Sequence, residues 1–159
     1  MRFKSLLSSL LCVLVLSIAS GSVYADDDSS DDDDFDEGVH KLVLQVSDSD
    51  IVKMKSALNI SANVSRYYSE NAEEVEIAIV VFNAGLDMVR KDKSPVADRL
   101  RSFVKGMHNV TFYACNNTIK TITKNEGKKP ELLNGVEVIE AGVVTMIELH
   151  EKGYTVVKP

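Results

Sequence analysis

The chain has 159 residues, of which 45% are hydrophobic and 26% are charged, and only three are prolines. This composition is that of an ordinary globular domain and excludes a repeat array or a wholly disordered protein. The net charge of −6 argues against a nucleic-acid-binding protein, and two cysteines are too few for a multi-disulfide scaffold or a four-thiolate zinc site.

Residues 1–25 have the features of a secretory signal peptide. Arg2 and Lys4 precede an uncharged, leucine-rich run, and a small-residue signal peptidase site ends at Ala25. An uncleaved membrane anchor is the alternative, but the apolar run is short for a span of roughly 20 residues. We therefore expect cleavage after Ala25, a periplasmic or secreted protein, and no stable membrane span in the mature chain.

Residues 26–38 are expected to form an acidic, disordered tail. They contain nine acidic residues and no basic one, and such a run cannot bury a core. The tail lacks the glycine and the spaced bidentate glutamate of a calcium-binding loop, so we expect no metal site there. Residues 39–159 hold 15 acidic and 16 basic residues and are nearly neutral.

Residues 39–159 alternate between predicted strands and helices and are expected to form one α/β domain. Apolar and β-branched runs predict strands at 39–46, 75–82, 109–114, 136–140 and 154–157. Helical spacing predicts helices over 51–68 (with a capping box from Ser47 and Asp50), from Pro95 to Gly106, around Ile119 and Ile122, and from Val143 to His150. This alternation predicts a three-layer α/β/α sandwich with a five-stranded, mainly parallel sheet.

Ligands of an open parallel sheet bind beyond the carboxyl ends of its strands. Signal cleavage removes Cys12, so Cys115 is the single thiol of the mature chain, and it follows a predicted strand and precedes a predicted helix. The amide groups and the dipole of a helix N-terminus stabilise a thiolate, which favours a functional cysteine. A buried structural cysteine is the alternative, and both readings stay open from placement alone.

Other chemistries lack the residues that they require. A Cys-His hydrolase needs an imidazole near the sulfur, whereas His40 and His108 belong to the opposite sheet edge and His150 to the end of the last helix. The sequence has no Cys-x-x-Cys, no glycine-rich phosphate loop and no cluster of metal ligands. We therefore expect no metal and no cofactor.

The sequence from Tyr113 to Thr118, with Ala-Cys-Asn-Asn at its centre, resembles the cysteine motif of DsrE/DsrF-like proteins, especially the exported ones. The C-terminal stretch from Leu133 to Pro159 and the Asp-containing start of the first helix resemble that family too, so the resemblance covers about residues 39–159. Many exported relatives have His-Gly-x-Gly after the second strand, where this chain has Phe82-Asn83-Ala84-Gly85 and matches only the last glycine.

The resemblance implies the three-layer fold with a five-stranded parallel sheet, a homo-oligomer (trimer or hexamer), and a sulfur relay in which Cys115 carries sulfur as a persulfide. Sulfur would come from a donor and pass to an acceptor protein. The residues that we expect around the thiol are Asn83, Gly85, Asn116, Asn117, Thr118 and Gly142. Two other functions stay open: a non-catalytic, oligomeric module that binds a small molecule or a protein, and a thiol redox sensor.

Overall fold

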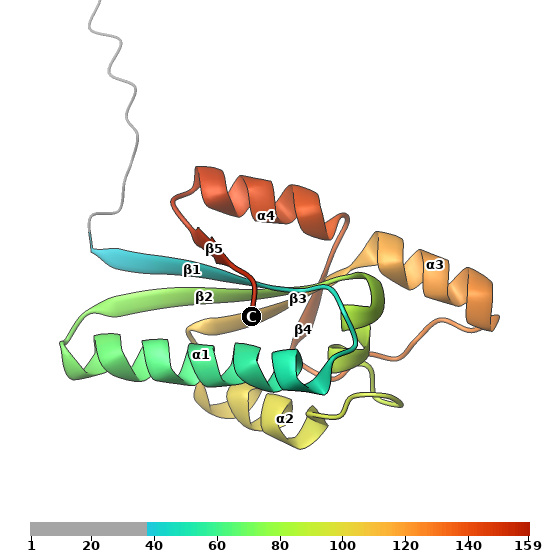
Figure 1. Cartoon of the computed structure of the whole chain (residues 1–159), viewed down its shortest axis with the longest axis horizontal. Helices are drawn as coiled ribbons and strands as arrows, with labels where there is room; N and C mark the ends of the chain where they lie inside the picture. The colour runs from blue at the N-terminus through green and yellow to red at the C-terminus, as the bar shows by residue number, and fades with distance from the viewer. Residues whose placement is uncertain (1–37) are drawn as a thin grey trace, which may run out of the picture. The chain divides into compact units, whose positions relative to one another are not determined.

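The computed structural model describes residues 38–159. The signal peptide expected over 1–25 lies outside the described residues, as does the acidic tail except for Gly38. The described elements, in chain order, are β1 (Val39–Val46), α1 (Ile51–Glu70), β2 (Glu74–Val81), the 3₁₀ helix η1 (Asn83–Val89), α2 (Ala97–Gly106), β3 (Val110–Cys115), α3 (Asn116–Glu126), β4 (Val136–Ile139), α4 (Gly142–Glu151) and β5 (Thr155–Val157) (Figure 1).

The five strands form one sheet in the order β4-β3-β2-β1-β5, and every neighbouring pair is parallel. The central strands β1 and β2 pair over eight residues, from Val39 opposite Glu74 to Val46 opposite Val81. This confirms the predicted α/β fold with a five-stranded parallel sheet. Because all strands run the same way, the ends of β2 and β3 lie at one edge with the helices that follow them.

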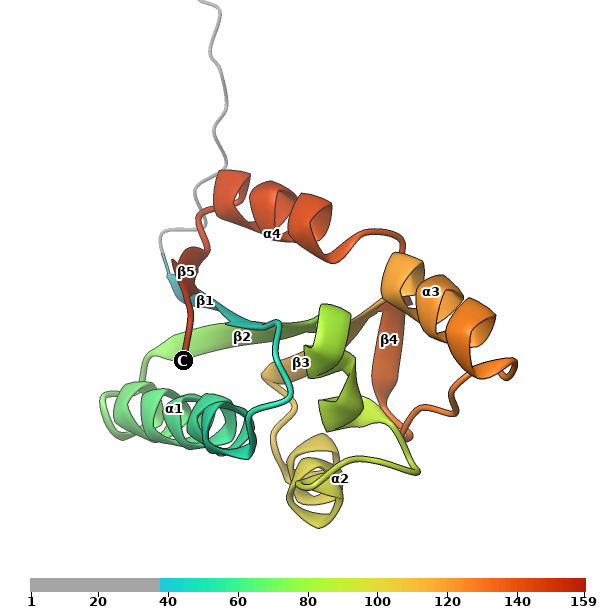
Figure 2. The ribbon, with the colours of Figure 1, turned by 45° about the vertical axis from the view of Figure 1, so that its right-hand side comes forward.

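Helices cover both faces of the sheet, with α1 and α2 on one face and α4 on the other (Figure 2). The larger core lies under α1 and α2, where Leu44, Ile79 and Phe112 of the sheet pack with Leu58 of α1 and Leu100 of α2. The smaller core lies under α4 and includes Val43, Val80, Phe82, Cys115 and Met146. The alternation along each strand follows from the two-residue period of strand side chains. Cys115 therefore belongs to the face that α4 covers.

Two helix starts differ from their predictions. The predicted capping box between Ser47 and Asp50 was wrong. Asp50 caps α1 by itself, because its carboxylate accepts from the Val52 amide at 2.7 Å. The Ser47 hydroxyl instead accepts from the Gln45 side-chain amide at 3.3 Å. Helix α2 begins at Ala97 rather than at Pro95. Before it, Ser94 donates its amide to the Arg90 carbonyl at 3.1 Å, and its hydroxyl accepts from the Val96 amide at 3.3 Å, so Pro95 and Val96 lie in a turn.

Within residues 38–159, no helix has the length and the apolar character that crossing a membrane requires.

Candidate functional site

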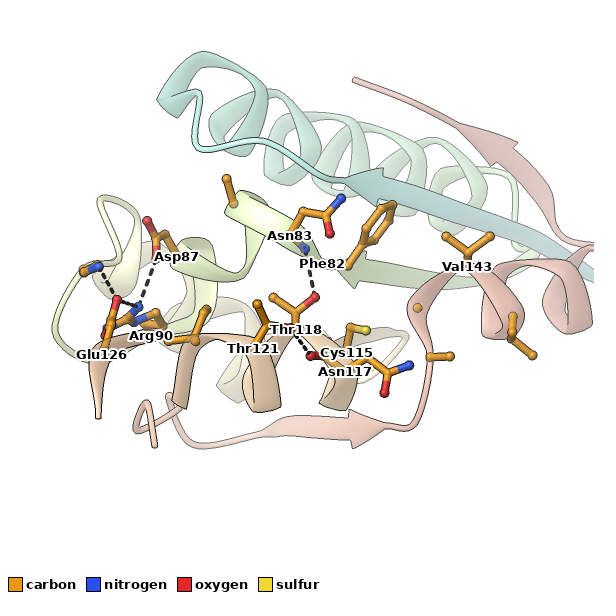
Figure 3. A pocket seen from close by; sticks show the side chains of 16 residues that line it. Phe82, Asn83, Asp87, Arg90, Cys115, Asn117, Thr118, Thr121, Glu126 and Val143 are labelled. Atoms are coloured by element: carbon orange, nitrogen blue, oxygen red, sulfur yellow. Dashed lines mark hydrogen bonds and ion pairs between the residues drawn. The ribbon is translucent and has the colours of Figure 1, made fainter. Parts of the chain in front are cut away.

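A cleft of about 570 Å³ opens beyond the carboxyl ends of β2 and β3 (Figure 3). Its walls come from η1, from α3 and from the first turn of α4. Cys115 lies at one end of the cleft beside Phe82 and Val143, and a charged group around Arg90 and Glu126 lies at the other end. The cleft is large enough for a small-molecule ligand.

Cys115 is the last residue of β3 and the N-cap of α3, and it is only 6% exposed. Burial raises the pKa of its thiol, but hydrogen bonds from the amides of Gly142, Thr118 and Asn117 and from the Thr118 hydroxyl lower it further than burial raises it. The net result is a pKa below the usual value for cysteine. Gly142 begins α4 and Asn117 lies in the first turn of α3, so two helix N-termini stabilise one thiolate.

The hydroxyl of Thr118 is oriented by the backbone of Asn83. The Asn83 amide donates to Oγ1 of Thr118 at 3.0 Å. A hydroxyl has a single proton, and because Oγ1 accepts from Asn83, that proton is free to point at the sulfur of Cys115. Asn83 also adopts a left-handed backbone with φ of +50°, a conformation that asparagine accepts more readily than most residues.

Five of the seven residues predicted for the site line the cleft: Asn83, Cys115, Asn117, Thr118 and Gly142. Their role toward a ligand stays a prediction. The other two predicted residues, Gly85 and Asn116, do not line it.

Gly85 and Asn116 have structural contacts instead. A Cβ atom on Gly85 would lie 2.2 Å from the carbonyl oxygen of Val46, so only glycine fits where η1 crosses the end of β1. Asn116 donates its side-chain amide to Glu140 at 2.8 Å, and Lys120 donates to the same carboxylate at 2.6 Å. These contacts fasten the start of α3 to the segment after β4.

The charged end of the cleft was not predicted. Arg90 is 2% exposed and makes two hydrogen bonds to Glu126, at 3.0 and 2.8 Å, and two to Asp92, at 3.0 and 2.8 Å. Arg90, and then Lys93 at 2.9 Å, lower the pKa of Glu126 to about 2. Arg90 and Glu126 are 36 residues apart, so no local pattern in the sequence connects them.

No imidazole is available as a base beside the thiol, because none of His40, His108 and His150 lines the cleft. In the part of the chain that the structure describes, no three His, Cys, Asp or Glu side chains are grouped to hold a metal ion. Hydrogen-bond donors, rather than a neighbouring base, therefore favour ionisation of the Cys115 thiol. Such a group acts as a nucleophile toward sulfur without needing a general base.

The fold is similar to that of a solved structure, the protein of unknown function MTH1491 from Methanobacterium thermoautotrophicum. The TM-score is 0.64 at 22% sequence identity, and the similarity covers 76% of this chain and 99% of that one. At this identity the likeness supports the α/β fold alone. No protein-family model matches the chain, and no curated protein does either.

Proposed function

We propose that this protein is an exported DsrE/DsrF-like sulfur carrier that holds sulfane sulfur on Cys115 as a persulfide. The observation that carries the proposal is the place of Cys115, which caps α3 and lines the cleft with Gly142 of α4, where donors from the first turns of both helices lower the pKa of its thiol. These donors stabilise a thiolate, and they can stabilise the negative charge of a persulfide in the same place. The resemblance of the Tyr113–Thr118 motif supports the same role.

The loading step is a sulfur transfer between two thiols. The Cys115 thiolate attacks the outer sulfur of a donor R–S–SH, and a new S–S bond forms on Cys115. The R–S to S bond breaks, its electron pair leaves on R–S⁻, and the proton stays on the transferred sulfur. One neutral sulfur atom moves, so the step needs no external oxidant or reductant. Attack by an acceptor thiolate on the outer sulfur of the Cys115 persulfide completes the relay.

The proposal also includes the exported location and a homo-oligomer, a trimer or a hexamer, with separate donor and acceptor partners. These parts rest on the signal peptide and on the family resemblance. Sulfur loading can be tested without knowing them, because any persulfide or polysulfide can serve as donor.

Intact mass spectrometry tests the carrier function. The mature chain, which keeps Cys115 as its single thiol, and the Cys115→Ala variant are each incubated with inorganic polysulfide. We expect a gain of about 32 mass units, one sulfur atom, on the wild type alone. The gain must reverse with a thiol reductant, because a sulfinic acid has nearly the same added mass and does not reverse. An equal gain on Cys115→Ala, or none on the wild type, contradicts the carrier function.

The low exposure of Cys115 favours one other function, a module in which the thiol is a packed residue. A thiol that takes no sulfur and resists alkylation in the folded protein supports that function. A disulfide between chains after peroxide, without any sulfur loading, supports the redox sensor instead.

A further inference from the structure

The cleft continues from Cys115 along α3 to charged side chains of both signs. From Cys115 to Glu126 there are eleven residues, which corresponds to about 16 Å along a helix at 1.5 Å per residue. Asp87 and Glu126 line this far end (Figure 3), and Lys93 lines the cleft beside Glu126, to which it donates. A sulfur atom alone needs only the thiol end, so the length of the cleft points to a larger donor.

Arg90 organises the charged end but has no capacity left for a ligand. Its guanidinium makes two hydrogen bonds to Asp92 and two to Glu126, and Asp87 lies 3.5 Å from Nη1. With a side chain that is 2% exposed, Arg90 acts as a buried anchor for the surrounding carboxylates.

Asp87 and Lys93 keep unused hydrogen-bonding capacity that faces the cleft. The Asp87 carboxylate is 29% exposed, and its one ionic contact among residues 38–159 is the 3.5 Å approach of Arg90. Lys93 is 45% exposed and uses one of its three ammonium protons on Glu126 at 2.9 Å. A partly exposed carboxylate with only one long ionic contact and an ammonium with spare protons form a pair suited to a ligand that carries both charges.

We propose that the sulfur donor of Cys115 is a short peptide persulfide that lies along α3, with its persulfide at Cys115 and an end that carries both an ammonium and a carboxylate at Asp87 and Lys93. This inference rests on the proposed function. An extended peptide spans about 3.3–3.6 Å per residue, so a peptide of a few residues, met by the long Lys93 side chain, covers the cleft. Free cysteine persulfide and inorganic polysulfide are too short to contact both ends.

In the transfer, the Cys115 thiolate forms a bond to the outer sulfur of the peptide persulfide while the peptide's own S–S bond breaks. The peptide leaves as a thiolate with the electron pair, and Cys115 keeps the sulfur and its proton. The ammonium at the far end of the peptide pairs with Asp87, and the carboxylate at the same end pairs with Lys93. These contacts position the donor and take no part in the exchange of bonds.

The test compares two donors on the full mature chain. One is glutathione persulfide, a tripeptide whose γ-glutamyl end carries both an ammonium and a carboxylate, and the other is inorganic tetrasulfide. The readout is the rate of sulfur gain on Cys115 by intact mass spectrometry. In Asp87→Asn/Lys93→Gln we expect the ratio of the glutathione persulfide rate to the tetrasulfide rate to fall about three- to tenfold, as the loss of two partly exposed ion pairs predicts. Lys91→Gln is the matched control, because Lys91 pairs with Glu131 outside this cleft.

An unchanged ratio in the double variant overturns this inference and leaves the carrier function in place, since the wild type still takes sulfur. An equal fall of the ratio in Lys91→Gln also overturns it, because the effect is then one of general surface charge. A wild type that takes sulfur from neither donor overturns the carrier function, and this inference with it.

Discussion

The amide of Asn83 donates a hydrogen bond of 3.0 Å to Oγ1 of Thr118, joining the first residue of η1 to the first turn of α3. Thr118 also donates to the sulfur of Cys115, which lowers the pKa of that thiol. The hydroxyl is therefore held between a donor on one side and an acceptor on the other. Asn83, whose backbone is left-handed, therefore contacts the hydroxyl that lowers the pKa of Cys115.

Thr118→Val should slow the reaction of Cys115 with iodoacetamide at pH 7. The change keeps the shape of the side chain but removes the hydroxyl that stabilises the thiolate. A hydrogen bond to a charged group contributes about 1.5–3 kcal/mol, so we expect a fall of about tenfold in the alkylation rate. The rate is measured from pH 5 to pH 10, and the midpoint of the profile should shift to higher pH.

Thr123→Val is the matched control for this change. Thr123 lies on the same helix, and its hydroxyl donates to the Ile119 carbonyl at 2.8 Å without lining the cleft. Its alkylation profile should equal that of the wild type. A Thr118→Val profile that also equals the wild type would show that the hydroxyl does not stabilise the thiolate.

Asn83→Val should lower both the stability of the fold and the reactivity of Cys115. Asn83 has φ of +50°, where a β-branched residue costs about 1–2 kcal/mol. Relief of that strain turns the amide away from Thr118, so alkylation of Cys115 slows as well. Asn83→Gly accepts the same backbone and should keep the wild-type alkylation rate. Urea unfolding and alkylation are measured on both variants, and equal results for the two contradict the role of the left-handed backbone.

The sheet could be predicted because its inner strands β1, β2 and β3 are largely buried and read as apolar runs. The bounds of β1 were correct, and those of β2 and β3 differed by one residue at each end. The start of α2 was missed because Pro95 at a first helical position is a local preference, whereas Ser94 forms a turn with the Arg90 carbonyl. The hydrogen bonds that Ser94 makes within residues 88–96 outweigh that preference.

The thiol end of the cleft could be predicted in part from the strand ends alone. That rule states which residues lie at the edge, but it does not state which way each side chain points. For this reason it placed Gly85 and Asn116 at the site, although Gly85 packs on Val46 and Asn116 on Glu140. The charged end could not be predicted, because it depends on distant segments of the chain that meet at Arg90.

Gly85→Ala should destabilise the fold by about 3 kcal/mol, near the upper end for overpacking. The added Cβ would lie 2.2 Å from the Val46 carbonyl oxygen and 2.6 Å from its carbon, and backbone atoms cannot move aside as a flexible side chain can. Gly106→Ala is the control, since no atom lies within 4 Å of its added Cβ and alanine favours a helix. Urea unfolding should separate the two, and equal stability of both variants contradicts the close contact.

Glu126→Gln should destabilise the protein at neutral pH and lose this effect in acid. The folded protein holds the pKa of Glu126 at about 2, below its usual 4.5, because Arg90 and Lys93 favour the carboxylate. A lowered folded pKa stabilises the fold fully above pH 4.5, and this contribution is lost as the pH falls toward 2. The difference in Tm between the wild type and Glu126→Gln should therefore be constant above about pH 5 and shrink between pH 4.5 and 2.

Glu131→Gln provides the comparison for this pH dependence. Glu131 is 65% exposed and lies 3.5 Å from Lys91, so its ion pair is solvated and weak. Its variant should differ little from the wild type at any pH between 2 and 7. A Glu126→Gln difference that stays constant down to pH 2 would mean that its carboxylate is not held ionised by Arg90. In that case packing would stabilise the charged end of the cleft, and Asp92 and Asp87 would be the carboxylates that balance the charge of the buried Arg90 guanidinium.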